Sequence, residues 1–297
     1  MRRCSSPFPR PAASFPLLGS MLAITAALLA TAPAAAEALS AEERSPRRYR
    51  LAVFPYLTPL RLEPIYAPIA QALAHTLDAG VRLVTRPTFR AFRRALAAER
   101  FEIVFLQPFD YVERAAALGY VPLARTAVDL AALIVAPADG RVRTESDLTG
   151  ATLAFPPRAA AVSRLALAAL RAGGRVPGRD FQVRFEPTHF ACLNRVLSGG
   201  AHACVTAAGP LALFAARRAG PFRVILRSRA VPGPLFAAHR SLPAAVRARL
   251  RAAIVGWQRT AAGRALLERG RLPAFVPARD ADYEPVRRLI RAGRGGG

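Results

Sequence analysis

The strongest constraint on the fold is an alternation of short apolar runs with helical stripes along most of the chain. Ile65, Ile69, Leu73 and Leu77 recur every four residues, as on one face of a helix. Repeated strand–helix units predict an α/β protein whose mixed, mostly parallel sheets are flanked by helices on both faces. The predicted strands are residues 51–54, 81–84, 101–106, 130–135, 151–155, 181–185, 203–206, 224–226 and 235–238.

The ends of these strands indicate where a ligand would bind. In sheets of this kind, ligands bind beyond the carboxyl ends of the strands, where loops converge. The loops that matter are therefore those after Phe54, Leu106, Phe155, Phe185 and Thr206.

The N-terminus predicts export. Arg2, Arg3 and Arg10 precede an almost wholly apolar run over residues 15–32, and three alanines at 34–36 offer a small-x-small cleavage site. This order is typical of a secretory signal peptide, here residues 1–36. An uncleaved membrane anchor is the alternative, because the run approaches the ~20 residues that span a bilayer. Cleavage would give a soluble periplasmic protein.

Basic residues are spread along the whole chain. The formal net charge is +24 and every base is an arginine, since the sequence contains no lysine. A nucleic-acid site would need basic residues on one face, interleaved with aromatic residues. The scattered arginines predict an anion-attracting surface and no nucleic-acid partner.

Two cysteines remain after the predicted cleavage, Cys192 and Cys204. In an oxidising compartment they form either a disulfide or two separate small core residues. Together with His189 and His202 they could ligate zinc. Their spacings match no known zinc-finger pattern, so no metal is predicted.

Six segments follow one another in the order of a known family: 53–56 (VFPY) with 66–68, 89–111 ending in QPFDY, 147–155 (DLTGATLAF), 189–207, 228–243, and 274–286. Together they resemble the phosphate, phosphite and phosphonate ABC-transporter substrate-binding family. The resemblance implies a two-lobed type II periplasmic-binding fold, with residues 37–134 and 236–297 in one lobe and 135–235 in the other. Two crossovers would form the hinge.

The resemblance also implies a set of ligand contacts in the cleft between the lobes. Tyr56 and Tyr111 correspond to family tyrosines that hydrogen-bond or stack on the ligand. His189, with Thr188 as a helix N-cap before it, corresponds to a histidine that donates to a ligand oxygen. Gln107 stands where the family often has glycine, and Thr206 could reach the cleft.

The loop after Phe155 departs from the family pattern. Its usual Ser/Thr-rich turn, which holds phosphonate oxygens at a helix N-terminus, is replaced here by PPRAAAVS at 156–163. Arg158 could grip a phosphonate, sulfonate or carboxylate instead, or be one more solvated arginine. An anionic ligand therefore stays in the prediction, although phosphonate specificity does not follow.

These features predict a binding protein, not an enzyme, because no G-x-S-x-G, H-E-x-x-H or Walker pattern is present. The expected protein is a monomer without a cofactor. It would close on a small anion, such as phosphonate, phosphite, phosphate or a related oxyanion, and present it to ABC-transporter membrane subunits. The alternative is a periplasmic sensing subunit that signals to a membrane partner.

Overall fold

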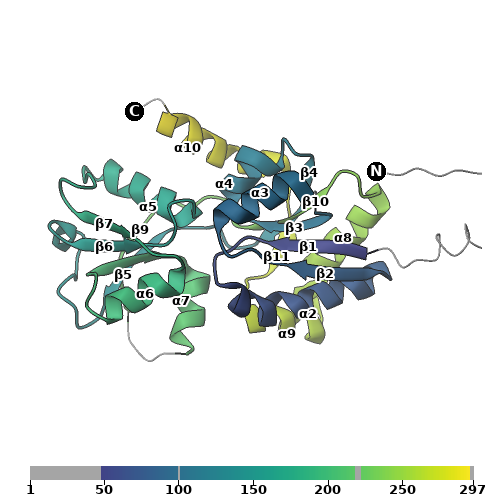
Figure 1. The fold of residues 1–297 in the computed structure, drawn as a ribbon, viewed down its shortest axis with the longest axis horizontal. Helices are drawn as coiled ribbons and strands as arrows, with labels where there is room; N and C mark the ends of the chain where they lie inside the picture. The colour runs from purple at the N-terminus through teal and green to yellow at the C-terminus, as the bar shows by residue number, and fades with distance from the viewer. Residues whose placement is uncertain (1–47, 100, 218–221, 295–297) are drawn as a thin grey trace, which may run out of the picture. The chain divides into compact units, whose positions relative to one another are not determined.

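The strands of the protein form two sheets (Figure 1). The computed structural model describes residues 48–99, 101–217 and 222–294, so the predicted signal peptide lies outside the described residues. The six-stranded sheet has the order β11-β4-β10-β3-β1-β2 and the five-stranded sheet the order β7-β6-β8-β5-β9. The first contains β1 (Arg48–Val53), β2 (Gly80–Val84), β3 (Ile103–Leu106), β4 (Tyr120–Thr126), β10 (Leu235–His239) and β11 (Phe275–Pro277). The second contains β5 (Leu133–Pro137), β6 (Thr152–Phe155), β7 (Gln182–Phe185), β8 (Ala203–Thr206) and β9 (Phe222–Arg227).

Helices cover both faces of each sheet. Figure 1 shows α3 on one face of the six-stranded sheet and α2 with α9 on the other, and α5 on one face of the five-stranded sheet with α6 and α7 opposite. None of the described helices has the length and hydropathy needed to cross a membrane. The α-helices are α2 (Pro59–Leu77), α3 (Phe89–Glu99), α4 (Pro108–Asp110), α5 (Ala161–Ala172), α6 (His189–Leu197), α7 (Ala208–Ala215), α8 (Ala244–Gly256), α9 (Ala261–Gly270) and α10 (Glu284–Arg294). A π-helix, η1 (Tyr111–Ala115), and the 3-10 helices η2 (Ser146–Leu148), η3 (Trp257–Arg259) and η4 (Asp280–Tyr283) complete them.

The sheets are mixed, as the sequence predicts, but parallel pairs do not outnumber antiparallel pairs, because β4 also pairs antiparallel with β11. β1 runs parallel to β2 and β3, and β6 runs parallel to β7 and β8. β10 is antiparallel to β3 and β4, and β5 is antiparallel to β8 and β9. β5 and β10 are the strands that follow the chain's crossings from one sheet to the other.

The two crossings, residues 127–132 and 228–234, are bonded to each other. Leu130 and Val231 exchange backbone hydrogen bonds of 2.7 and 2.9 Å, and the Ser228 hydroxyl accepts from the Ala132 N–H at 2.9 Å. Gly233 lies so close to Thr126 that an added Cβ would be 1.9 Å from its Oγ1, which explains the glycine. The crossings therefore form one paired connection. The lobe boundaries near 134 and 235 stay a prediction.

An aromatic cluster fills the core beside the six-stranded sheet. Phe105 of β3 is 2% exposed, and its ring centroid lies 4.7 Å from that of Phe236, 5.5 Å from Tyr66 and 5.6 Å from Phe54. All four residues of β3 are buried, as expected for a strand covered on both faces. This cluster holds the carboxyl ends of β1 and β3 in place, and the candidate site begins there.

Candidate functional site

A cavity of about 620 Å³ is lined by elements of both sheets. All five loops singled out in the sequence contribute to its wall, as predicted from the strand ends. They bring Tyr56 after β1, Gln107 after β3, Ala160 after β6, His189 after β7 and Ala207 after β8. This volume lies within the roughly 300–1,000 Å³ range of pockets for organic ligands.

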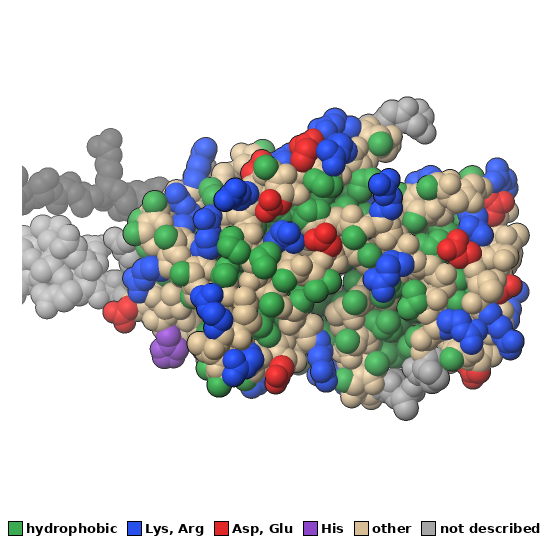
Figure 2. All heavy atoms as spheres, turned by 180° about the vertical axis from the view of Figure 1, so that it is seen from behind, with side chains coloured by type: hydrophobic (Ala, Val, Ile, Leu, Met, Phe, Trp, Pro, Cys, Tyr) green, Lys and Arg blue, Asp and Glu red, His purple; other side chains and the backbone are tan. Residues whose placement is uncertain are grey.

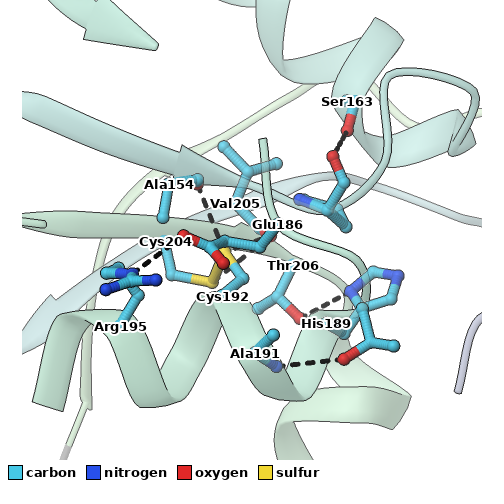
Figure 3. The surroundings of a disulfide bond; sticks show 12 residues. Ala154, Ser163, Glu186, His189, Ala191, Cys192, Arg195, Cys204, Val205 and Thr206 are labelled. Atoms are coloured by element: carbon cyan, nitrogen blue, oxygen red, sulfur yellow. Dashed lines mark hydrogen bonds and ion pairs between the residues drawn. A yellow bond between two sulfur atoms is a disulfide. The ribbon is translucent and has the colours of Figure 1, made fainter. Parts of the chain in front are cut away.

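His189 is the most deeply buried titratable group that lines this cavity. It begins α6, where Thr188 caps the helix by accepting from the Ala191 N–H at 3.0 Å, as the sequence predicts. Its Nδ1 lies 3.0 Å from Thr206 Oγ1, and Nε2 has no hydrogen-bond partner among the described residues. In Figure 3 this second ring nitrogen points away from Thr206. The side chain is 5% exposed, and burial lowers the pKa of His189 to about 4.

This buried histidine makes stability depend on pH. The pKa of His189 is near 6.5 in an unfolded chain and about 4 in the folded protein. Between these two pH values the unfolded state binds a proton that the folded state does not bind. The free energy of unfolding should therefore fall as the pH drops below 6.5, by about 3 kcal/mol once the pH is below 4. Urea unfolding at pH 7.5 and pH 4.5 measures this loss.

The His189→Asn variant is the control for that measurement. It removes the titrating group, so it should lose less stability than the unmodified chain over the same pH interval. Equal losses would contradict the assignment of this pH dependence to His189.

Tyr56 reaches the cavity from the loop after β1. Its hydroxyl lies 3.2 Å from that of Tyr66, and burial raises the pKa of Tyr56 to about 12. Both hydroxyls therefore stay neutral. The hydrogen bond between them uses the O–H of one tyrosine, so the O–H of the other tyrosine can donate to a different partner. Tyr56 is a hydrogen-bonding group at the cavity wall, 8% exposed.

Gln107 joins elements of the two sheets. Its Nε2 donates to Asp110 Oδ2 at 2.8 Å and to the Ala159 carbonyl at 2.9 Å, and its Oε1 accepts from the Ala161 N–H at 2.7 Å. Arg93 of α3 donates to Asp110 Oδ1 at 2.6 Å and to Ala159 O at 3.3 Å. The first turn of α5 is thus bound by side chains from the other sheet's elements.

Two further contacts link elements of the two sheets. Arg164 of α5 forms an ion pair with Glu113 at 2.8 Å, and its guanidinium lies 4.0 Å from the centroid of the Phe109 ring. Arg61 of α2 lies 4.6 Å over the ring of Phe190 in α6. Partly buried guanidinium–ring contacts of this kind stabilise by roughly 0.5–2 kcal/mol.

Three of the predicted contact residues do not line the cavity. Tyr111 is buried, donates to Asp280 Oδ1 at 2.6 Å and packs on the Tyr283 ring, and burial followed by Asp280 raises its pKa well above the ordinary value. Thr206 is fully buried behind His189. Arg158 is exposed, with its guanidinium 4.5 Å from the Phe185 ring centroid. Tyr111 and Arg158 therefore contact other side chains of the protein, Asp280 and Phe185, outside the cavity wall. Thr206 contacts the cavity residue His189 from behind.

Cys192 and Cys204 are joined in a disulfide that links α6 to β8, with 5.6 Å between their Cα atoms (Figure 3). The other members of the zinc alternative have partners elsewhere: His189 pairs with Thr206, and His202 Nδ1 accepts from the Thr152 N–H at 2.8 Å. Within the described part of the chain, no group of three or more His, Cys, Asp and Glu could hold a metal ion.

Several cavity residues were not predicted from the sequence. Phe54 and Phe89 supply aromatic wall, and α9 with the turn after it contributes Arg264, Glu268 and Arg271. The segments that carry the family resemblance do not include α9. The phenylalanines were detectable in principle, because Phe54 is the last residue before the first ligand loop.

The surface carries the scattered charge that the sequence predicts. Figure 2 shows basic side chains spread over one face, with hydrophobic and acidic side chains among them. They do not gather into a single basic groove on that face.

Two sheets joined by two crossings around a shared cavity define a type II periplasmic binding protein. Residues 51–283 match the family described as "ABC transporter, phosphonate, periplasmic substrate-binding protein". The chain belongs to this family of periplasmic substrate-binding proteins. The family implies a small ligand and membrane transporter partners, and a binding protein rather than an enzyme, in agreement with the sequence prediction.

Solved structures give the same fold at low sequence identity. PhnD1 from Prochlorococcus marinus in complex with methylphosphonate has a TM-score of 0.73 and 13% identity, covering 84% of this chain and 99% of that one. A binding protein component of an ABC phosphonate transporter from Pseudomonas aeruginosa has a TM-score of 0.70 and 15% identity over 82% and 86%. The aliphatic sulphonate binding protein SsuA from Escherichia coli has 0.57 and 17% over 84% and 94%. No curated protein matches the sequence.

Proposed function

We propose that this protein binds a small oxyanion of the phosphonate type in the cavity and delivers it to the membrane subunits of an ABC transporter. The observation that carries the proposal is the free Nε2 of His189, in a cavity lined from both sheets. The proposal includes export to the periplasm with removal of residues 1–36, and a monomeric mature protein. Its lobes are residues 37–134 with 236–297, and residues 135–235.

Neutral donors line the cavity beside three guanidinium groups, those of Arg227, Arg264 and Arg271, and both kinds of donor suit an oxyanion. Thr206 is fully buried, so its hydroxyl can donate to His189 Nδ1 and leave the proton of the ring on Nε2, facing the cavity. α7 begins beside it without a side-chain cap, and Ala208 and Gly209 line the cavity. Uncapped N–H groups at a helix start bind anions, and here His189 supplies a second donor.

The position of the cavity supports closure on the ligand as part of this proposal. A ligand that contacts His189 from one sheet and Tyr56 from the other binds more tightly when both sets of contacts are made. It therefore stabilises the closed arrangement by its differential affinity for that state. The paired crossings at Leu130 and Val231 are the hinge in this proposal.

Thermal shift measurements test the proposal. The chain is expressed with its own N-terminus, purified from the periplasm, and checked by intact mass for the start at Glu37. The panel contains phosphate, phosphite, alkylphosphonates, sulfonates, sulfate and small carboxylates. A binding anion at a hundredfold over its dissociation constant should stabilise by about 2.7 kcal/mol and raise Tm by about 5–10 °C.

Two variants locate the binding site. His189→Asn should lose most of the shift, whereas Arg158→Ala should keep it, because Arg158 lies outside the cavity wall. An unmodified chain that shows no shift with any anion of the panel would refute the proposed ligand class. A shift lost only in Arg158→Ala would move the site to the loop after β6.

A further inference from the structure

Most of the cavity wall is apolar. Three phenylalanines from elements of the six-stranded sheet line it: Phe54, Phe89 and Phe105. The ring centroid of Phe54 lies 6.3 Å from that of Phe89 and 5.6 Å from that of Phe105. Val162 and Leu213 line it from the second sheet's elements. A hydrated inorganic oxyanion is badly placed against such a wall, since it would lose water without gaining partners there. An apolar group gains from the same burial.

At the start of α5, the first N–H that could bind an oxygen of an oxyanion is already occupied. Gln107 Oε1 accepts the Ala161 N–H of α5 at 2.7 Å, and the Ala160 N–H donates to the Pro157 carbonyl at 2.8 Å. Pro156 and Pro157 carry no N–H at all. The side chain of Gln107 thus takes a position at which a bound anion could accept. The donors that remain for the anion are His189 with the start of α7, and the arginines Arg227, Arg264 and Arg271.

We infer that the solute is a phosphonate whose substituent is an alkyl chain or an aromatic ring, and that Gln107 sets this preference against inorganic phosphate and phosphite. The inference rests on the proposed function and adds a substrate class to it. The head group lies toward His189, and the substituent lies against the wall formed by Phe54, Phe89 and Phe105. Gln107 closes the α5 side of the cavity to a second set of oxygen contacts.

A homologous ligand series tests the substituent. Isothermal titration calorimetry with the periplasmic protein compares phosphate, phosphite, methyl-, propyl-, hexyl- and phenylphosphonate. Each methylene group that becomes buried should tighten binding about fourfold, so hexylphosphonate should bind roughly a hundredfold or more tightly than methylphosphonate. Affinity that stays level or falls with chain length would overturn the inference and leave the proposed function standing. Absence of binding to every member would refute both.

A variant of Gln107 tests the source of the preference. Gln107→Gly frees the Ala161 N–H, so its affinity for phosphate and phosphite should rise at least about tenfold, as one hydrogen bond to a charged group allows. Its affinity for hexylphosphonate should change much less. Arg158→Ala, in the same loop region but outside the cavity wall, is the control and should change neither.

The variant and the series are read independently. Circular dichroism establishes that Gln107→Gly is folded, and Gln107→Ala replaces it if it is not. A folded variant that gains no affinity for phosphate or phosphite would overturn the role assigned to Gln107. The series is measured on the unmodified chain, so it decides the substrate class whether or not either variant folds.

Discussion

Replacing Arg93 with alanine should lower the free energy of unfolding by about 3 kcal/mol, because it removes the charge partner of a buried carboxylate. Asp110 is fully buried and lies 2.6 Å from Arg93 Nε. Burial raises the pKa of Asp110, although Arg93 and Gln107 both oppose the rise. Without Arg93 the carboxylate keeps the Gln107 hydrogen bond and the weaker influence of the Arg114 charge. Urea unfolding at pH 7.5 measures the loss.

Two further variants separate this effect from lost packing. The double variant Arg93→Ala, Asp110→Asn should recover part of the loss, because it leaves no uncompensated charge. The loss for Arg93→Ala alone should shrink at lower pH, where Asp110 can take up a proton. Arg179→Ala, which breaks the exposed pair with Asp180, should have little effect. A loss as small in Arg93→Ala as in Arg179→Ala would contradict the prediction.

Removing the disulfide should cost a similar amount. Cys192 and Cys204 are 12 residues apart and fully buried, and a crosslink over a loop of this length stabilises by about 3 kcal/mol. The double variant Cys192→Ala, Cys204→Ala should lose that much in urea unfolding. The bond fixes the start of α6 against β8, so it also supports His189 and Thr206.

A reductant supplies the control for the disulfide. The unmodified chain should lose stability when it is unfolded with dithiothreitol present, whereas the double variant should be insensitive to it. Equal midpoints for the unmodified chain with and without the reductant would show that the bond contributes nothing under these conditions.

The sequence predicted most of the fold because most strands are short apolar runs closed by turn residues. It missed β4, since Pro122 and Arg125 make that segment look unlike a central strand. Pro122 is accommodated where the pairing of β4 with β10 shifts register, beside Ala237. The segment that begins at Pro108 forms α4 followed by a π-helix, a change of winding that no apolar stripe indicates.

The candidate site was predictable where a residue lies shortly after the end of a strand. Tyr56, Gln107 and His189 come after β1, β3 and β7, and all three line the cavity. Tyr111 lies on the π-helix, and its partner Asp280 is 169 residues away, so its orientation depends on tertiary contacts that local pattern does not contain. For Arg158 the sequence left two roles open, an anion contact or one more solvated arginine, and the chain's arginine-rich composition gave no means of deciding.

The position of β10 between β3 and β4 imposes an order on folding during synthesis. Every strand of the five-stranded sheet lies within residues 133–227, so that sheet can close as soon as Arg227 is available. The six-stranded sheet lacks an interior strand until residues 235–239 are made, and its N-terminal strands must wait with unpaired edges. The early strands β1, β2 and β3 are therefore among the last to complete their sheet. Until the C-terminal segment is made, their exposed apolar surface and unpaired edges favour aggregation.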